Sequence, residues 1–213
     1  MSNPDNPIDI IYEDDFIMAV NKRPNIPVTP NQPGDKNLTD RLSTFLAERG
    51  DTYKAHPCHR LDKETSGVVL FAKGKKSQAA MMTLFAEREI EKYYIALVRG
   101  KMAKPDGDIK TPIGGKSAWT EYHVIDEREG YSIVHIRLHT GRTNQIRIHF
   151  ASIGNPLLGE TKYAFRRDFT VKFRRVALHC ETISFRSPFT LEPLNITANL
   201  PDDLRLMIEN VDK

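Results

Sequence analysis

Residues 59–73, HRLDKETSGVVLFAK, bring several reactive side chains together directly before an apolar run. Asp62 stands between Arg60 and Lys63. Neighbouring cations favour the ionised form of a carboxylate, and an ionised carboxylate serves as a nucleophile or a general base. The structural alternative is a loop aspartate that accepts hydrogen bonds from backbone amides. Asp62 is therefore the first candidate for a catalytic group.

The same segment contains two less well supported catalytic groupings. Glu64 would supply a second carboxylate, which the hydrolysis of glycosidic bonds usually requires. A spacing of two residues does not show that the two groups converge, and an exposed turn glutamate is the commoner case. Ser66, His59 and Asp62 have the residue types of a catalytic triad, but nothing around them resembles a nucleophile elbow.

A metal site is the next alternative. His56, Cys58 and His59 have ligating side chains, and His179 and Cys180 follow much later. No spacing among them matches a zinc module. A buried cysteine with hydrogen-bonded histidines is the simpler explanation, so we expect no metal.

A second cluster is LHTGRTNQIRIH, residues 138–149. Gly141 predicts a turn and Thr143 a helix N-cap. On the helix that follows, Arg142, Gln145 and His149 would share one face. Arg147 is a candidate partner for a buried carboxylate elsewhere; contact with phosphate or solvent is the alternative.

Hydrophobic periodicity predicts the elements that position these clusters. Helices are expected over residues 38–50, 75–90, 144–153 and from 201 onward. The inward-facing residues predicted for these four helices are, in the same order, Leu38, Leu42, Phe45 and Leu46; Met82, Phe85 and Ala86; Ile146, Phe150 and Ile153; and Leu204, Met207, Ile208 and Val211. Strands are expected on both sides of the acidic turn at residues 13–15 and over residues 66–72, 92–99, 119–126, 131–138 and 176–185. Tyr93 and Tyr94 must point to opposite faces of their strand.

The element order indicates the fold class. Strands outnumber helices and many are consecutive, which predicts an α+β fold with a large, mixed, mostly antiparallel sheet flanked by helices and loops. Residues 23–34 are rich in proline and predict an extended loop, and residues 101–116 predict a hairpin loop. No linker is evident, so residues 1–213 are expected to form a single catalytic domain.

Composition excludes several classes of protein. The N-terminal residues have no basic region followed by an apolar one, so they are not a signal peptide. No run approaches 18 apolar residues, so no membrane span is expected. Two cysteines are too few for a disulfide framework and are typical of a cytoplasmic protein. Residues 137–175 carry nine basic residues against Glu160 and Asp168, a local excess of +7 that suits a polyanion such as a nucleic acid. A solvated basic face with no ligand is the alternative.

Both clusters resemble the RluA-type pseudouridine synthases. HRLDKETSGVVLFAK is similar to the family signature HRLD-x-x-TSG-x-x-x-x-AK, and LHTGRTNQIRIH is similar to L-x-TGR-x-HQIR-x-H. IIYEDDFIMAVNK, KYYIALVRG, GKSAWTEYHVI, GNPLLGETKYA and RVALHCETISFRSP resemble the family's other motifs, in the family's order. The likeness runs from about residue 8 to residue 204.

The resemblance implies a reaction. A uridine in ribosomal or transfer RNA would lose its C1′–N1 bond, its uracil would rotate, and a C1′–C5 bond would form, without a cofactor or a metal. Asp62 would be the essential aspartate, acting at C1′ or through a glycal route. Tyr94 would pack on the base, Arg147 would pair with the aspartate, and Arg60 would fill the space of the flipped-out nucleotide.

The resemblance also implies a set of residues around the substrate and an active-site cleft across the sheet. These residues are His59, Arg60, Leu61, Thr65, Lys116, Arg142 and Gln145. The pattern begins by residue 8, which leaves no room for an N-terminal S4-like RNA-binding domain, and we expect a monomer.

Three departures from the family pattern bear on the choice of RNA. Asn144 replaces a histidine, Arg23-Pro24-Asn25 replaces Pro-Ser-Gly, and Ala164 replaces a glycine after Tyr163. Two other functions are weighed beside the synthase. One is a non-catalytic RNA-binding or RNA-folding protein on the same scaffold, and the other is a glycosidic hydrolase that uses Asp62 and Glu64.

Overall fold

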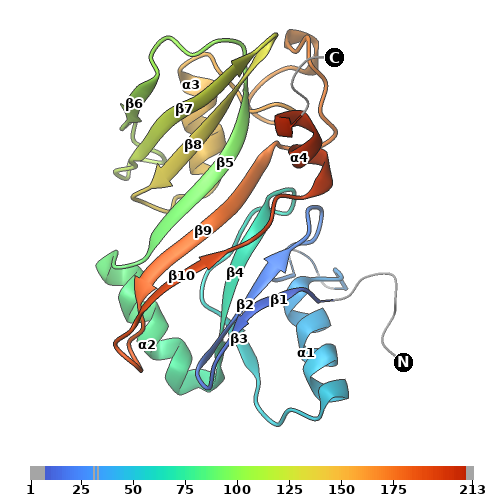
Figure 1. Cartoon of the computed structure of the whole chain (residues 1–213), viewed down its shortest axis with the longest axis vertical. Coiled ribbons are helices and arrows are strands. Elements are labelled where there is room, and N and C mark those ends of the chain that lie inside the picture. Colours follow the sequence, from blue (N-terminus) through green and yellow to red (C-terminus); the bar gives the residue numbers. More distant parts are fainter. Residues whose placement is uncertain (1–7, 31, 33, 210–213) are drawn as a thin grey trace. The chain divides into compact units, whose positions relative to one another are not determined.

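The computed structural model describes residues 8–30, 32 and 34–209, and it confirms the α+β class (Figure 1). The chain divides into two compact units. Unit 1 comprises Met1–Ile90 with Thr182–Asn199, and unit 2 comprises Glu91–Glu181 with Leu200–Lys213. None of the helices within the described ranges has the length and apolar character needed to cross a membrane.

Unit 1 is built on antiparallel strand pairs. The strand β2 (Ile17–Lys22) pairs with β1 (Ile10–Glu13) and with β4 (Ser66–Lys73), and β4 also pairs with β3 (Ala55–Pro57). The end of β9 (Leu178–Arg186) pairs with β10 (Pro193–Thr197). Nearly every residue of β2 and β4 is buried, which explains why both read as continuous apolar runs rather than as alternating ones.

The first helix of unit 1 follows its sequence signals. Asn37 caps α1 (Leu38–Arg49), because its side-chain oxygen accepts a hydrogen bond from the Asp40 amide at 3.0 Å. Gly50 ends the helix at φ +90°, a left-handed conformation that glycine adopts without strain. Leu38, Leu42 and Leu46 face inward, as predicted.

The predicted inward face of α2 (Gly74–Glu87) is wrong. Ser77, Met81 and Leu84 are buried, whereas Met82 is 46% exposed and Ala86 is also exposed. Met81 and Met82, like Leu84 and Phe85, are adjacent apolar residues, so the periodicity fits two stripes about 100° apart. Packing against β3 and β4 selects the stripe that contains Met81.

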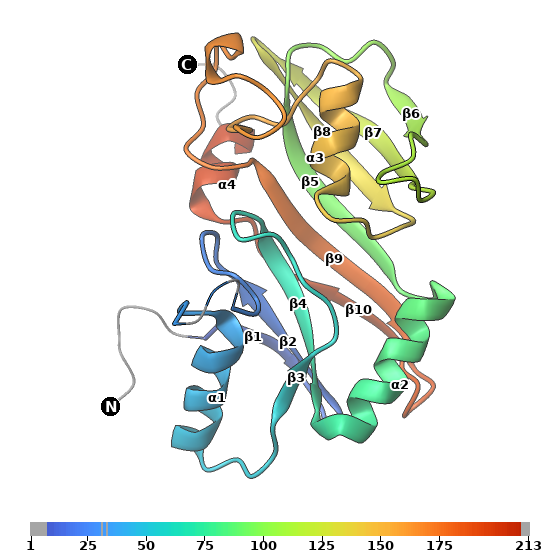
Figure 2. The same cartoon turned by 180° about the vertical axis from the view of Figure 1, so that it is seen from behind.

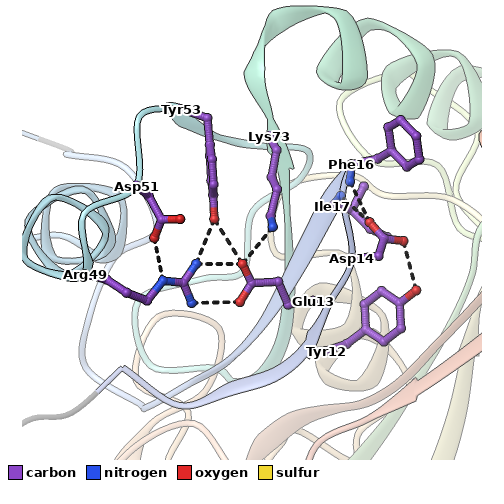
Figure 3. Close-up of polar contacts among 9 residues, drawn as sticks. All are labelled: Tyr12, Glu13, Asp14, Phe16, Ile17, Arg49, Asp51, Tyr53 and Lys73. Carbon is purple, nitrogen blue, oxygen red and sulfur yellow. Dashed lines mark hydrogen bonds and ion pairs between the residues drawn. The ribbon is translucent and has the colours of Figure 1, made fainter.

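A network of charged side chains joins three segments of unit 1 (Figure 3). The Glu13 carboxylate, at the end of β1, accepts two hydrogen bonds from Arg49 and one from Tyr53, and it forms an ion pair with Lys73 at 2.7 Å. The hydrogen bonds from Arg49, with further help from Lys73 and Tyr53, outweigh burial and lower the pKa of Glu13 to about 2. The ionised carboxylate thus ties β1 to α1 and to the end of β4.

Unit 2 contains a four-stranded antiparallel sheet. Its order is β5 (Glu91–Arg99), β8 (Tyr131–Leu138), β7 (Thr120–Arg128) and β6 (Asp106–Ile109). The sequence predicts only a loop where β6 lies. Gly107 leaves room for Tyr122 there, because a Cβ atom at position 107 would lie 2.7 Å from the Tyr122 hydroxyl.

Two helices complete unit 2. Figure 2 shows α3 (Gln145–Ser152) against the sheet, with Ile146 and Phe150 buried as predicted. Two details differ from prediction. Asn144, at φ +54°, is the N-cap residue instead of Thr143, and Ile153 is 41% exposed. In α4 (Asp202–Glu209), Leu204 is buried and Met207 and Ile208 pack against the same core; the predicted Val211 lies outside the described residues.

Candidate active site

Asp62 lies in unit 1, in the loop between β3 and β4. The Thr65 amide donates to the Asp62 carbonyl at 3.1 Å, so residues 62–65 form a closed turn. The Asp62 side chain is half-buried, whereas Arg60 is exposed. The turn therefore holds the candidate carboxylate just before β4, a strand in which nearly every residue is buried.

The residues around Asp62 fix this loop. The ring nitrogen Nε2 of His59 accepts the Leu70 amide at 3.1 Å, and its ring lies 5.3 Å from that of Phe85. Leu61 and Thr65 are 5% and 2% exposed. His59, Leu61 and Thr65 thus support the loop in this structure, and their contact with a substrate stays a prediction.

One residue that anchors the Asp62 turn was not among the predicted site residues. Lys22, at the end of β2, is fully buried. Its ammonium donates to the carbonyls of Arg23 at 3.0 Å, Ile26 at 2.8 Å and Lys63 at 3.0 Å, one for each N–H that a lysine offers. Lys22 therefore joins the Asp62 turn to the proline-rich loop. In the sequence, Lys22 is a lysine at the end of a largely apolar strand, which is a position typical of a solvated side chain.

The other candidate groups near Asp62 are bound into the fold. Ser66 and Cys58 are 1% and 4% exposed. Burial raises the pKa of the Cys58 thiol to about 12. Among the described residues, no three or more His, Cys, Asp or Glu side chains gather in a way that would hold a metal ion.

The candidate tyrosine lies in unit 2. Tyr94, on β5, is 5% exposed. Its neighbour Tyr93 is half-buried; its hydroxyl donates to Glu91 at 2.8 Å, and its ring stacks on His135 with centroids 5.5 Å apart. The two tyrosines occupy opposite faces, as the strand geometry predicts.

Arg147 has a carboxylate partner that sequence analysis did not identify. Its Nε and Nη2 donate to the two oxygens of Glu160 at 2.7 and 2.8 Å, a bidentate pair. Glu160 is fully buried and Arg147 is 8% exposed. In the sequence, Glu160 was only an acid within a basic region. Arg147 is thus a buried partner of a carboxylate, as expected, and the carboxylate found is Glu160.

Glu160 also organises the chain that follows it. Its Oε1 accepts the backbone amides of Thr161, Lys162 and Tyr163 at 3.0, 2.8 and 3.3 Å. Burial alone would raise the pKa of this carboxyl, but the hydrogen bonds from Arg147 and these amides prevail, and its pKa lies below the ordinary value. A single ionised side chain therefore fixes both Arg147 and residues 161–163.

The Arg147 guanidinium has an aromatic neighbour as well. It lies over the ring of Tyr163, 5.6 Å from the centroid. The Tyr163 hydroxyl accepts a hydrogen bond from Asn144 Nδ2 at 2.9 Å. Asn144 and Tyr163, which both belong to segments that depart from the family pattern, thus meet beside Arg147.

Gln145 is part of the scaffold of α3. Its oxygen accepts from Thr140 and from the Arg142 amide, and its nitrogen donates to the Trp119 carbonyl and to Thr120. These four bonds use the full capacity of the amide. His149 contacts the same Thr120 hydroxyl at 2.9 Å, so Gln145 and His149 share a face as predicted. This geometry favours a positioning role for Gln145 over substrate contact.

The remaining candidates of unit 2 lie at its surface. Arg142 donates through Nε to the Ser117 carbonyl at 3.0 Å, and Lys116 is exposed in the turn before it. The structure thus places His59, Arg60, Leu61, Asp62 and Thr65 together in unit 1, and Tyr94, Lys116, Arg142, Gln145 and Arg147 in unit 2. The convergence of the two groups on one cleft, and the pairing of Arg147 with Asp62, stay predictions, as does the single catalytic domain.

Comparison with known proteins identifies the family. Residues 16–152 match the model described as RNA pseudouridylate synthase. The chain is 34% identical to the "uncharacterized RNA pseudouridine synthase YlyB" of Bacillus subtilis (strain 168), over 97% of this chain and 73% of that protein. It is 33% identical to the ribosomal large subunit pseudouridine synthase D of Vibrio parahaemolyticus, over 98% and 72% of the two chains.

The fold agrees with this match. The structure of human RNA pseudouridylate synthase domain containing 4 superposes with a TM-score of 0.77 at 24% identity, covering 92% of this chain and 90% of the human one. These matches confirm the resemblance that the two sequence clusters indicated. The chain belongs to the RNA pseudouridylate synthase family, whose enzymes isomerise uridine in RNA to pseudouridine.

Proposed function

We propose that the protein isomerises uridine in ribosomal RNA, with Asp62 as its catalytic carboxylate. The observation that carries the proposal is the placement of Asp62. It lies in a turn that Lys22, His59 and the Thr65 amide fix in place, within a chain that matches the family almost from end to end. A carboxylate held in this way is ready to act on a sugar carbon without rearrangement.

The reaction needs one carboxylate and no added atoms. The C1′–N1 bond breaks and a C1′–C5 bond forms, while the C5 proton leaves and N1 regains a proton. Asp62 acts at the sugar, either by bonding to C1′ or by assisting a glycal route through C2′. Because the uracil stays in the site as both leaving group and nucleophile, a second carboxylate of the kind that hydrolases use is not required.

Tyr94 and Arg147 are assigned by their match to the family motifs. Tyr94 packs against the uracil and assists removal of the C5 proton. Arg147 neutralises the charge that Asp62 carries and steadies its ionised form. Arg60 fills the space that the target nucleotide leaves, and its exposure is compatible with that role. Lys116 and Arg142 contact the RNA.

Ribosomal RNA is the proposed substrate because of a relative's name. One of the relatives described above is named for the large ribosomal subunit. Transfer RNA is the second choice. The target base must leave its stack, which costs a few kcal/mol that contacts in the pocket recover. Cys58 and Cys180 are both buried and are not joined by a disulfide, which fits the reducing cytoplasm in which ribosomal RNA is modified.

Mapping in cells tests the proposal. Ribosomal and transfer RNA from cells that lack this gene would be mapped for pseudouridine, and then mapped again after wild-type protein or Asp62→Asn is restored. We expect wild type alone to restore one or more sites in ribosomal RNA. Restoration by Asp62→Asn as well would refute the catalytic role of Asp62. Restoration only in transfer RNA would correct the substrate.

The two other functions give different results. A non-catalytic RNA-binding protein would restore no site in either RNA while still binding it. A hydrolase would release free uracil and leave abasic positions, and it would depend on Glu64 as much as on Asp62.

A further inference from the structure

Residues 161–174 of unit 2, TKYAFRRDFTVKFR, form a loop, here called the basic loop, with an unusual surface. It carries five basic side chains and one acidic one, a net charge of +4 in 14 residues, whereas the whole chain has a formal net charge of +3. The rest of the chain is therefore close to neutral. Four of its residues are aromatic.

Both ends of the basic loop are held by buried charges. Glu160 accepts the first three amides of the loop. At the other end Arg175, 3% exposed, forms a bidentate pair with Asp203 at 2.7 and 2.9 Å. The two ends also touch, because a Cβ atom on Gly159 would lie 1.8 Å from the Arg175 carbonyl oxygen. A loop closed at its base in this way keeps its shape without a partner.

The middle of the loop separates an inner from an outer face. Phe169 is 8% exposed and belongs to the hydrophobic core of unit 2, and Val171 and Phe173 pack against that core. The residues between them, Lys172 among them, are exposed, and so is Arg174. This alternation sends the apolar side chains inward and the cations outward.

Phe165 is an exception to this alternation. It is 68% exposed, although the loop buries its other two phenylalanines fully or in part. The guanidinium of Arg167 lies over its ring, 5.1 Å from the centroid, and 82% of the Arg167 side chain is exposed. The loop therefore presents an aromatic ring and a planar cation to solvent, beside further cations.

We propose that the basic loop binds a single-stranded stretch of the substrate RNA, in which Phe165 stacks on a base while Arg167, Lys172 and Arg174 contact phosphates. Proteins bind unpaired RNA by stacking bases on aromatic rings or on arginine planes, in a groove or patch of positive charge. An acidic peptide would use the cations but would leave the exposed ring without a function. The identity of the ligand as RNA rests on the proposed function.

The anchor of the loop relates this contact to the proposed site. Glu160 holds both the loop and Arg147, and Tyr163, at the start of the loop, lies against the Arg147 guanidinium. Asn144 and Ala164, two positions where the chain departs from the family pattern, lie at the same end of the loop; Asn144 bonds to Tyr163, and Ala164 packs on the core. RNA on the loop would thus lie beside Arg147, where it can select the segment around the target.

The test measures binding apart from chemistry. Fluorescence anisotropy would compare a labelled 12-nucleotide single-stranded RNA of mixed sequence with the duplex formed from it, using the full chain. We expect Phe165→Ala to weaken binding of the single strand by about five- to 150-fold, the range for loss of one stacked base. Leu191→Ala, which removes a side chain that is 65% exposed in unit 1, is the matched control and should bind like wild type.

The salt dependence of binding measures the contribution of the cations separately. The double variant Lys172→Gln, Arg174→Gln should lower the slope of log K against log salt by about 1.4, or about 0.7 for each phosphate contact on a single strand. Lys104→Gln, at an exposed lysine outside the loop, should leave the slope unchanged. Because all these positions are exposed, the thermal unfolding of the variants should match that of wild type.

The outcomes separate this proposal from the proposed function. Turnover of ribosomal RNA by Phe165→Ala should show a raised KM with a much smaller change in kcat. Weakened RNA binding by the variant, with no isomerisation even by wild type, would support the loop and refute the proposed function. Binding of single strands by Phe165→Ala as tight as by Leu191→Ala would overturn the loop as a base-stacking site, whatever the catalytic result.

Discussion

Replacing Glu160 by glutamine should destabilise the protein far more than an ordinary polar substitution. The change keeps the shape of the side chain but removes its charge. Glu160 is fully buried, and Arg147, 8% exposed, would be left facing a neutral amide. Breaking a buried ion pair by removing one partner costs about 3–5 kcal/mol, because the remaining buried charge loses the bidentate partner that offset its desolvation.

Thermal and urea unfolding give the size of the effect. For a chain of this length, about 3–5 kcal/mol corresponds to a fall in Tm of about 6–20 °C. Glu160→Asp, which keeps the charge, should lose much less. Asp202→Asn breaks a pair with Arg205 whose aspartate side chain is 84% exposed, and it should change stability by less than about 1 kcal/mol.

The pH dependence checks the same reasoning. The pKa of Glu160 is lowered in the folded protein, from an ordinary value of 4.5. Its ionisation therefore stabilises the fold above that ordinary value, and the gain is lost as the pH falls through the folded value. The gap between wild type and Glu160→Gln should shrink in acid. A Glu160→Gln variant within 1 kcal/mol of wild type at pH 7 would refute the reasoning, and so would a gap that does not depend on pH.

A buried lysine, a charge network and a buried thiol give three further predictions. Lys22→Met should lower the free energy of unfolding in urea by about 3 kcal/mol, since three carbonyls lose their donor. It should also lower kcat, because the Asp62 turn loosens. Wild-type values for both quantities would contradict the anchoring role. Glu13, with a pKa of about 2, should contribute about 1 kcal/mol to the free energy of unfolding at neutral pH, and this contribution should be lost as the pH falls from about 4.5 towards 2. If Glu13→Gln and wild type lost stability in parallel as the pH falls, the prediction would be wrong. Burial and a pKa of about 12 should make Cys58 resist iodoacetamide at pH 8 until the protein unfolds; rapid labelling of Cys58 in the native protein would disprove this.

Much of the fold was predictable because its longer elements carry regular patterns. The strands β4, β5 and β8 and the helices α1 and α4 combine apolar runs or stripes with clear ends. The sequence does not indicate β6 or β3. DGDI contains one apolar residue and AHP is three residues long, and strands such as these exist because a neighbour offers hydrogen bonds.

The candidate site residues were predictable from the sequence, whereas the buried residues that hold them in place were not. The HRLD and GRTNQIR clusters marked Asp62 and Arg147 because reactive side chains are dense there. Glu160 and Lys22 gave no such signal, since an acid among cations and a lysine at a strand end both look solvated. Their burial arises from long-range packing, which no local pattern encodes.

Tritium release from RNA labelled at uridine C5 tests the central claim most directly. The RNA would come from cells lacking this gene, and wild type, Asp62→Asn and the matched neighbour Glu64→Gln would be compared at equal concentration. Wild type and Glu64→Gln should release tritium in step with pseudouridine formed, and Asp62→Asn should release none above background. Release by Asp62→Asn at the wild-type rate would contradict the catalytic role of Asp62, and no release by wild type on RNA that it binds would contradict the isomerase itself.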